Sequence, residues 1–414
     1  MKIWLLTISE PLPINKGIRK NRTAFLAEKL IERGHSVLWW TSAFNHFKKE
    51  WIFNEDTTLN LSDNFTIKAL RGWGYKKNFS LKRFLDHRII ALKFKKLALK
   101  EMKPDIIVAS MPSHDLAFQA VVFSKRNKIP VIMDVRDQWP DIFFEYFPAW
   151  ARKIAKVFLW RDFKMVKYCF QNATHLVSMM GSMLDWALLK TKREKTINDR
   201  IFYLGAKKRK SMPSATEKLS SIKNLVKDKF IFIFIGAFNE TYNPLILTKA
   251  AKALSNLNIH FILGGDGIYF SQVKQASEKL RNITLTGWLS EEEINFLLSL
   301  SNIGIIPSSR KIDAFPNKAF TYFSAGLPLV SSLEGDLKEI IKKHNLGLYY
   351  PANNLPLLIE CIKQLYENRN LYKEMSQKVK EVFDEHFDAD KIYKEYADYI
   401  EKTTSKYKNH IQTN

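Results

Sequence analysis

Residues 315–332 read FPNKAFTYFSAGLPLVSS, and the order of residue types in this stretch decides how the second half of the chain folds. The PNK turn at 316–318 predicts the start of a helix, and the AG pair at 325–326 predicts its end, before a buried strand. A helix N-terminus offers free N–H groups and the positive end of a dipole, which suit a diphosphate. Lys318 would add a cation there. On spacing alone, a capped helix between two strands remains an equally open interpretation.

Short apolar runs with the length of buried strands recur outward from this stretch, each followed by a helical pattern. They lie at Lys2–Thr7, Ser36–Trp40, Ile106–Ala109, Val131–Asp134, His175–Met179, Phe230–Ile235, His260–Leu263, Ile283–Thr286, Ile303–Pro307 and Leu329–Ser332. Short strands that alternate with longer helices are typical of parallel, doubly wound sheets. The sequence therefore predicts an α/β fold with one such sheet in each half.

A length of 414 residues favours two domains. We expect an N-terminal domain over residues 1–203 and a C-terminal domain over residues 204–385. The basic stretch Asp199–Ser214, with a glycine and a proline, is the expected linker. Residues 386–414 form a charged helical segment that we expect to pack back towards the N-terminal domain.

The positive charge lies almost entirely in the first half of the chain. The net charge is +23, and residues 1–210 contain 40 Lys and Arg against 19 Asp and Glu, a surplus of 21. Such asymmetry indicates contact with a polyanion, either nucleic acid or an anionic membrane surface. No RRM, KH or zinc motif supports nucleic acid, so we expect a membrane partner and no nucleic acid.

Two basic stretches carry the aromatic and aliphatic residues that suit a membrane surface. Residues 83–103 read RFLDHRIIALKFKKLALKEMK, where Leu92 and Leu99 fall near the predicted apolar face. Residues 151–170 read ARKIAKVFLWRDFKMVKYCF. Basic helices with Trp and Phe lie well in lipid headgroups, although a core-facing helix with a solvated basic face fits the same pattern.

The two cysteines and the N-terminus indicate the compartment. Cys169 and Cys361 have neither disulfide-framework nor metal spacing, which fits a reducing compartment. The run MKIWLLTISEPLP is too short for a signal peptide and predicts a first strand. No apolar stretch is long enough to span a bilayer. We therefore expect a cytoplasmic protein, peripheral on the inner face of the cytoplasmic membrane.

The order of these segments resembles the retaining family 4 glycosyltransferases, also called glycosyl transferases group 1. The similarity is greatest to bacterial enzymes that build O-antigen and capsule. The stretch 315–332 resembles the donor-binding segment of that family. Further similar segments, in the same order, are residues 11–33 ending in RGH, DVRDQWP at 134–140, LGGDG at 263–267, NITLTGW at 282–288 and GIIPS at 304–308.

This resemblance implies a GT-B fold, in which two Rossmann-like domains face a central cleft. It implies transfer of a sugar from a UDP- or GDP-linked donor to a saccharide on polyprenyl diphosphate, during O-antigen, lipopolysaccharide or capsule synthesis. The implied reaction is retaining and needs neither a metal nor a cofactor. The partners expected are the nucleotide sugar, the lipid-linked acceptor and an anionic membrane.

The resemblance also implies roles for individual residues. As catalytic residues we expect Asp137, Arg136, Lys318 and Asp313. As donor-binding residues we expect Gly17, Gly236, Gly287, Trp288, Arg310, Pro316, Asn317, Ala319 and Thr321. Pre-placed cations stabilise the charge that develops on a departing diphosphate. Lys318, Arg310 and Lys311 are the candidates for that task, although the last two also fit solvated loop charges.

The acidic candidates have structural alternatives. Asp313 could bond a hydroxyl of the donor sugar or act as a helix cap. Arg136 cannot act as a base at neutral pH, so its expected role is electrostatic, whereas Asp137 could orient the acceptor or accept its proton. The two could equally form a structural pair. His114, just after a strand, could reach the cleft, but a satisfied loop histidine is the simpler interpretation.

Two positions depart from the family pattern. Thr321 stands where a glutamate usually holds the ribose hydroxyls, and the segment 236–243, GAFNETYN, lacks the usual cations. Two alternative functions therefore stay open. One is a degenerate GT-B module that docks at the membrane or a partner, and the other is a nucleotide-sugar epimerase.

Overall fold

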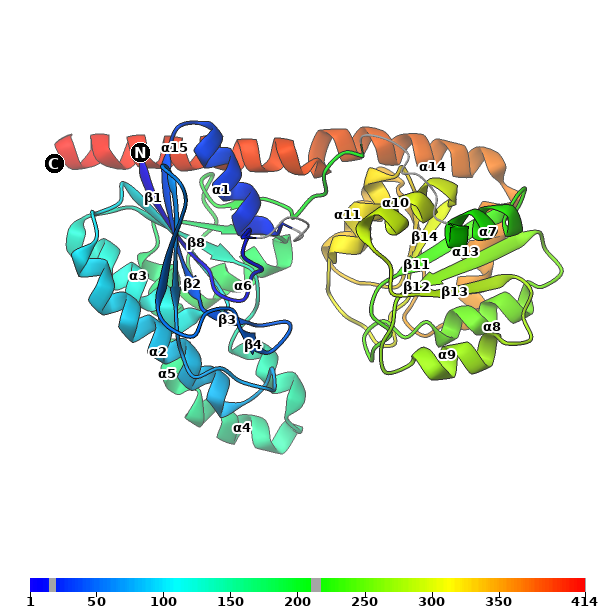
Figure 1. Cartoon of the computed structure of the whole chain (residues 1–414), viewed down its shortest axis with the longest axis horizontal. Helices are drawn as coiled ribbons and strands as arrows, with labels where there is room; N and C mark the ends of the chain where they lie inside the picture. The colour runs from blue at the N-terminus through cyan, green and yellow to red at the C-terminus, as the bar shows by residue number, and fades with distance from the viewer. Residues whose placement is uncertain (15–19, 210–216, 414) are drawn as a thin grey trace. The chain divides into compact units, whose positions relative to one another are not determined.

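The computed structural model describes residues 1–14, 20–209 and 217–413. The chain forms two compact units. Unit 1 comprises Met1–Tyr203 and Ile392–Asn414, and unit 2 comprises Leu204–Lys391 (Figure 1). The chain therefore passes between the units twice.

Unit 1 is built on one eight-stranded sheet. In spatial order its strands are β10 (Arg200–Ile201), β9 (His175–Ser178), β8 (Val131–Val135), β7 (Ile106–Ser110), β1 (Lys2–Leu6), β2 (Ser36–Ser42), β6 (Phe65–Leu70) and β5 (Thr57–Ser62). The five strands predicted in the first half are confirmed. The expectation of a wholly parallel sheet is wrong at one edge, because β5 runs antiparallel to β6. A separate hairpin of β3 (Phe44–Asn45) and β4 (Glu50–Trp51) follows β2.

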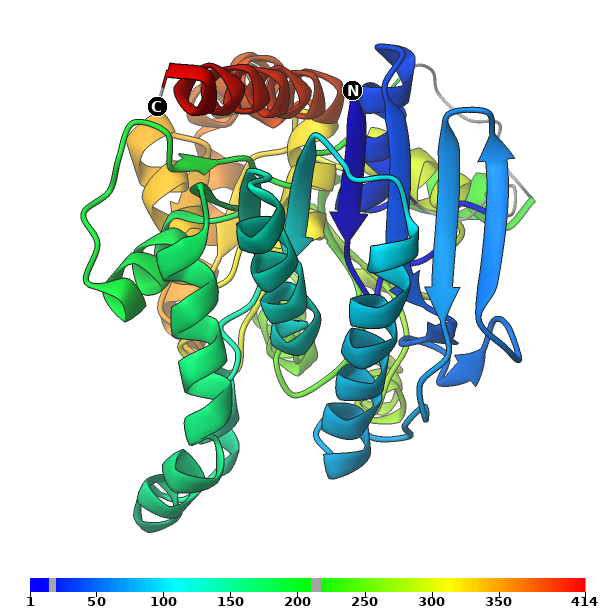
Figure 2. The same cartoon turned by 90° about the vertical axis from the view of Figure 1, so that its left-hand side faces the viewer.

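Helices cover the sheet of unit 1. They are α1 (Arg22–Glu32), α2 (Leu81–Leu97), α3 (His114–Asn127), α4 (Ala149–Phe158), α5 (Trp160–Asn172), α6 (Gly181–Thr191) and most of α15 (Ala389–Thr413). Helices α2, α3 and α5 lie side by side on one face of the sheet (Figures 1 and 2). Under them Trp4, Trp40 and Phe94 meet edge to face with ring centroids 5.0–6.1 Å apart. These rings bury a large apolar area, which anchors the core.

Helix α2 buries a different face from the one predicted. Ile90, Ala91 and Phe94 are buried, whereas Leu92 and Leu99, expected on the apolar face, are exposed. The buried set is rotated by about one residue from the predicted stripe, and it includes the polar residues Arg83, Asp86 and His87 of the first turns.

Helix α15 belongs to unit 1 through specific contacts. Tyr393 stacks on Phe25 of α1 with ring centroids 5.3 Å apart, and Glu401 Oε1 lies 2.6 Å from Nε2 of His35. These contacts tie the helix to α1 and to the start of β2. None of the described helices is long and apolar enough to cross a lipid bilayer.

Unit 2 contains a wholly parallel six-stranded sheet. In spatial order its strands are β13 (Ile283–Gly287), β12 (Ile259–Gly264), β11 (Phe230–Ile235), β14 (Ile303–Ile306), β15 (Leu329–Ser331) and β16 (Gly347–Tyr349). The helices are α7 (Glu217–Leu225), α8 (Leu245–Ala253), α9 (Phe270–Ser277), α10 (Glu291–Leu300), α11 (Asn317–Ser324), α12 (Asp336–His344), α13 (Leu355–Glu367) and α14 (Arg369–Val382). Residues of α8, α9 and α13 share one core beneath the sheet, and α10 and α11 lie on the opposite face (Figure 1).

The stretch quoted first folds as predicted. Helix α11 begins at Asn317 after Pro316 and ends before Ala325, and β15 starts at Leu329. Both units are therefore α/β layers around a mainly parallel sheet, which confirms the predicted fold class.

Candidate functional site

The amine of Lys318 occupies an unusual place at the carboxyl end of β11. Its Nζ lies 4.4 Å from the ring centroid of Phe234 and 4.0 Å from that of Tyr242. A Cβ on Gly236 would lie only 2.4 Å from the same nitrogen, so glycine leaves the room that the amine fills. Among the described residues Nζ has no hydrogen-bond partner. Burial lowers the pKa of Lys318 to about 7, because removal from water penalises the charged form.

Tyr322 fixes the position of this amine. Its buried hydroxyl accepts a 2.7 Å hydrogen bond from the backbone N–H of Ile235 at the end of β11. Gly304 of β14 allows this approach, since a Cβ there would lie 2.6 Å from the tyrosine ring. The first turn of α11, with Lys318 on it, is thereby held against the strand ends. Sequence reasoning missed Tyr322 and Tyr242, and only the spacing of aromatics in the helix gave a signal for the former.

The LGGDG segment has a packing role at the same edge. A Cβ on Gly265 would lie 1.9 Å from the carbonyl oxygen of Gly236, and one on Gly267 would lie 2.4 Å from that of Phe238. Gly236 N donates to Gly264 O at 2.9 Å. These glycines let two strand-end loops touch through their backbones, which supports the Lys318 surroundings.

The other predicted donor residues surround the strand ends in different ways. Gly287 ends β13 with a φ of 71°, and Trp288 after it is 78% exposed. Arg310 is exposed, and the hydroxyl of Thr321 donates to the carbonyl of Asn317 at 3.1 Å. This i to i−4 bond engages the hydroxyl proton of Thr321, which would otherwise be available to a hydrogen-bond acceptor on a ligand.

Asp313 lies at the start of α12. A Cβ on Gly335, the N-cap of that helix, would meet the Asp313 carboxylate at 1.8 Å. Asp313 also forms a β-bridge with Glu334. A carboxylate at a helix N-terminus stabilises the helix, so this placement favours the helix-cap role over a contact with the donor sugar.

Arg136 of unit 1 belongs to a buried ion network. Its Nε donates to Asp134 at 2.9 Å, and its Nη1 pairs with Glu10. Arg22 donates to both oxygens of Asp134, at 2.8 and 3.0 Å. Arg136 is therefore paired with Asp134 and Glu10.

Opposite charges in this network stabilise one another. Burial opposes the charged form of Asp134, but the guanidinium groups of Arg136 and Arg22 outweigh it and lower the pKa of the carboxyl. Both arginines are thus held as fixed cations at the carboxyl end of β8. Sequence reasoning did not find Glu10 or Arg22, because their partners are more than a hundred residues away.

The remaining unit 1 candidates differ in how they are placed. Asp137 follows β8 and accepts a hydrogen bond from the backbone N–H of Gln138 at 2.8 Å. It also adds a favourable charge interaction at Arg83. Gly17 lies outside the described residues. Asp137 and Arg136 share one strand end, and Lys318 and Gly236 share another in unit 2.

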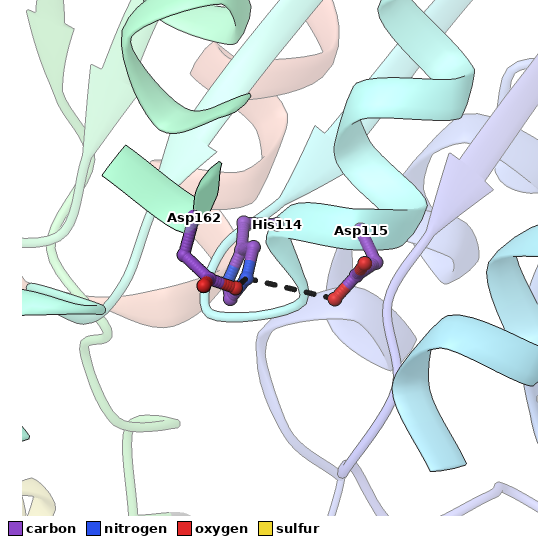
Figure 3. A group of neighbouring side chains, drawn as sticks. All are labelled: His114, Asp115 and Asp162. Carbon is purple, nitrogen blue, oxygen red and sulfur yellow. Dashed lines mark hydrogen bonds and ion pairs between the residues drawn. The ribbon is translucent and has the colours of Figure 1, made fainter. Parts of the chain in front are cut away.

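His114 forms a small cluster with two carboxylates (Figure 3). Its Nε2 lies 2.6 Å from Asp162 and 3.5 Å from Asp115. Burial disfavours the charged imidazole, yet the bond to Asp162 and the nearby charges raise the pKa of His114. The three ligand atoms are close enough to hold one metal ion. A protonated histidine satisfies the same carboxylates, in line with the simpler interpretation of His114.

Helix α4 exposes nearly all of its length. Among its described side chains only Ala155 is buried. The large apolar residues exposed here are Trp150, Ile154, Val157, Phe158 and, on α5, Trp160. Exposed cations near them in the sequence include Arg152, Lys153, Lys156, Arg161 and Lys164. Helix α4 lies on the side of unit 1 where the parallel strands end (Figures 1 and 2).

A family of known proteins matches one of the two units. Residues 215–382, within unit 2, match the family described as Glycosyl transferases group 1. The curated relatives include the O-antigen chain mannosyltransferase C of Escherichia coli, 26% identical over 184 residues. That match covers 44% of this chain and 49% of the relative, so the chain spans about half the length of the curated relatives it matches.

Solved structures match over nearly the whole chain. Anabaena HepE in complex with UDP superposes with a TM-score of 0.67 at 14% identity, over 97% of this chain and 100% of that one. Sucrose-phosphate synthase from Thermosynechococcus elongatus gives a TM-score of 0.70 at 13% identity, over 98% and 99%. The fold is therefore GT-B, as the sequence resemblance predicted.

Proposed function

We propose that the protein transfers a sugar from a UDP- or GDP-linked donor to a saccharide carried on polyprenyl diphosphate. The product would enter O-antigen, lipopolysaccharide or capsule synthesis. The observation that carries this proposal is the buried amine of Lys318, which has no partner among the described residues and lies at the N-terminus of α11. A relative named as an O-antigen mannosyltransferase and a structural neighbour with bound UDP support the choice of substrates.

In the proposed donor complex, the diphosphate accepts hydrogen bonds from the N-terminal N–H groups of α11. Pro316, Asn317 and Ala319 shape this turn, and Lys318 supplies the cation. Backbone N–H groups and the helix dipole suit such an anion. An amine with a pKa near 7 takes up a proton readily when an anion replaces its apolar surroundings.

The other end of the donor lies along the neighbouring strand ends. The exposed Trp288 beside Gly287 offers a face for the base, and Thr321 takes the position next to the ribose. Arg310 adds a second cation near the diphosphate. Asp313 contributes indirectly, because it holds the start of α12.

Chemistry in this site rests on charge stabilisation. When the anomeric bond breaks, negative charge develops on the departing diphosphate and the sugar becomes oxocarbenium-like. Protonated Lys318 and the fixed N–H dipoles stabilise that charge without reorganisation. The family resemblance supports a retaining outcome without a metal ion.

Unit 1 would hold the acceptor. Asp137, at the end of β8, orients the acceptor hydroxyl and accepts its proton. Arg136 acts electrostatically, since its guanidinium is locked by Glu10 and Asp134.

The exposed face of α4 would dock unit 1 on the inner face of the cytoplasmic membrane. Its aromatic and aliphatic side chains suit the headgroup region. Each neighbouring Lys or Arg contributes about 1 kcal/mol at an anionic surface. Helix α2 is a weaker candidate, because it buries one face in the core.

Calorimetry with UDP and GDP tests the donor site. The native protein should bind one of them, and Lys318→Met should weaken binding at least about tenfold. Lys249→Met, an exposed lysine on α8, is the matched control. Equal binding by all three proteins would refute the donor site, and absence of nucleotide binding in the native protein would favour the binding-module alternative.

Turnover tests the reaction itself. A panel of UDP- and GDP-sugars with polyprenyl-diphosphate-linked saccharides should yield an extended lipid-linked product with retained anomeric configuration, followed by NMR. Release of a free epimerised sugar without acceptor would point to the epimerase instead.

A further inference from the structure

A second group of basic side chains, absent from the site described above, lies in unit 1. We call Lys49, Arg83, His46, Tyr75 and His87 the basic cluster. They come from the β3–β4 hairpin, the loop after β6 and the first turns of α2. Strands β2 and β6 are parallel neighbours, so the hairpin and the loop both begin at the carboxyl ends of these strands. Open α/β sheets bind ligands beyond the carboxyl ends of their strands.

Burial outweighs the carboxylates near the basic cluster, because Asp137 and Asp86 favour the charged form of Arg83 and yet the pKa of Arg83 is lowered. Among the described residues, the bonds of Lys49 Nζ go to Asn78 Oδ1 at 2.5 Å and to His46. Nη1 of Arg83 donates to the carbonyl of Asn78 at 2.9 Å, and its Nε is buried without a partner. Asp86 also accepts a 2.8 Å hydrogen bond from the backbone N–H of Gly74.

Burial makes this arrangement unfavourable for the empty protein. Arg83 is only 7% exposed, and it lies 4.3 Å from the ring centroid of Trp139. Burial lowers the pKa of Arg83, and burial together with Arg83 lowers that of Lys49. Burial and the same two cations lower the pKa of His46 to about 4. A bound anion would relieve each of these penalties.

The hydrogen bonds also orient a free donor. The Tyr75 hydroxyl and His46 Nδ1 are 2.6 Å apart. The ammonium of Lys49 lies 3.5 Å from the same Nδ1 and can only donate, which favours the neutral tautomer in which Nδ1 accepts and Nε2 carries the proton. His87 lies behind, 1% exposed, with both ring nitrogens unpartnered among the described residues. Buried donors of the basic cluster thus remain unpartnered among the described residues at Arg83 Nε and at one ring nitrogen of His87, and an oxyanion could accept from them.

The basic cluster is joined to α4 by aromatic contacts. Phe79, next to Asn78, lies 5.0 Å from Phe143 and 5.6 Å from Phe147 between ring centroids. Phe147 is two residues before α4. A phosphate bound at the basic cluster would therefore lie close to the surface proposed to meet the membrane.

We propose that Lys49, Arg83 and His46 bind a phosphate or diphosphate group of the acceptor, an inference that rests on the proposed transfer to a lipid-linked acceptor. The lipid chain of such an acceptor would leave towards α4. The same side chains would accept a soluble phosphate compound, so the experiments below distinguish the two sources.

Pyrophosphate binding by calorimetry tests the chemistry without any turnover. Two independent sites are expected in the native protein, one at Lys318 and one at the basic cluster. Lys318→Met should abolish the first only, and Lys49→Gln should weaken the second about tenfold or more. The matched control is Lys76→Gln, an exposed lysine of the same loop. Arg83→Lys keeps the charge but loses the planar fork, and it should weaken the same site.

The result that overturns the proposal is equal pyrophosphate binding by Lys49→Gln and Lys76→Gln. Lys49 is half-exposed, so its variant decides the matter even if Arg83→Lys does not fold. Failure of the proposed donor function would instead appear as a Lys318→Met variant that retains both sites.

Vesicle flotation tests the source of the phosphate. Phosphatidylcholine vesicles doped with polyprenyl diphosphate should bind the native protein and the Lys76→Gln control more strongly than Lys49→Gln. Vesicles with phosphatidylglycerol instead should not separate the variants. Loss of pyrophosphate binding without a change in flotation would support the phosphate site and overturn the lipid-linked source.

Discussion

Replacing the buried amine of Lys318 should make the protein more stable while it removes function. Lys318→Met keeps a flexible stem of similar volume but places a thioether between Phe234 and Tyr242, where sulfur–aromatic contacts are favourable. A buried group without a partner destabilises the native state, so its removal should relieve that cost.

The magnitude follows from the pKa of Lys318. Burial lowers it from 10.5 to about 7, and each unit corresponds to 1.36 kcal/mol, so the charged amine costs about 5 kcal/mol. Between pH 7 and 10.5 the unfolded chain holds this proton and the folded chain does not. Stability of the native protein should therefore rise with pH across that window, and the variant should lack this rise.

Denaturant unfolding at intervals from pH 6 to 10, followed by circular dichroism, measures both effects. At pH 7 the variant should unfold at higher denaturant than the native protein, and the two should converge near pH 10. Lys249→Met should follow the native curve, since that lysine is exposed. A variant that is less stable at pH 7 and keeps the native pH dependence would refute the assigned burial of the amine.

Three further outcomes are expected. Asp134→Asn should destabilise the protein by about 3–5 kcal/mol in urea unfolding, because two buried arginines lose their anion. In the native protein, the stabilisation by ionised Asp134 is present above pH ~4 and is lost as the pH falls further. Unchanged stability of the variant would contradict the ion network. Thr321→Glu should tighten UDP or GDP binding in calorimetry through charge-assisted bonds to the ribose, whereas weaker binding would show that the hydroxyl makes a needed contact. Asp162→Asn should lower the pKa of His114 in an NMR titration. In the native protein, the stabilisation from protonated His114 beside Asp162 is complete below pH ~6.5 and is lost as the pH rises through the pKa of the folded state. An unshifted titration would exclude the pairing of His114 with Asp162.

The strands predicted from sequence share a property that the missed ones lack. Continuous apolar runs such as Phe230–Ile235 are buried on both faces, and their length and spacing suffice to locate them. Strand β6 alternates buried and half-exposed residues, and β5 at the sheet edge is mostly exposed. Neither gives a continuous apolar signal, so the antiparallel edge was not predicted.

The site was predictable only where local sequence decides it. The helix start at Asn317 and the cation at Lys318 follow from the PNK turn. The insertion of that amine beside Gly236, and the anchor from Tyr322 to Ile235, depend on how β11 and α11 pack. Long-range pairing hides such contacts from a single sequence.

The basic cluster shows the same limit in unit 1. Its members are separated by up to about forty residues, and no motif joins them. The network around Arg136 and Asp134 is similar, because Glu10 and Arg22 reach it from more than a hundred residues away in the sequence. Such groups become visible only when the loops after neighbouring strands are placed together.

The two passages of the chain between the units impose an order on biosynthesis. A ribosome delivers all of Leu204–Lys391 before Ile392–Asn414, which unit 1 needs to cover α1 and the start of β2. Unit 2 can therefore close as a continuous segment while unit 1 still lacks a helix. Until translation passes α15, the nascent unit 1 should expose Phe25 and remain a target for chaperones.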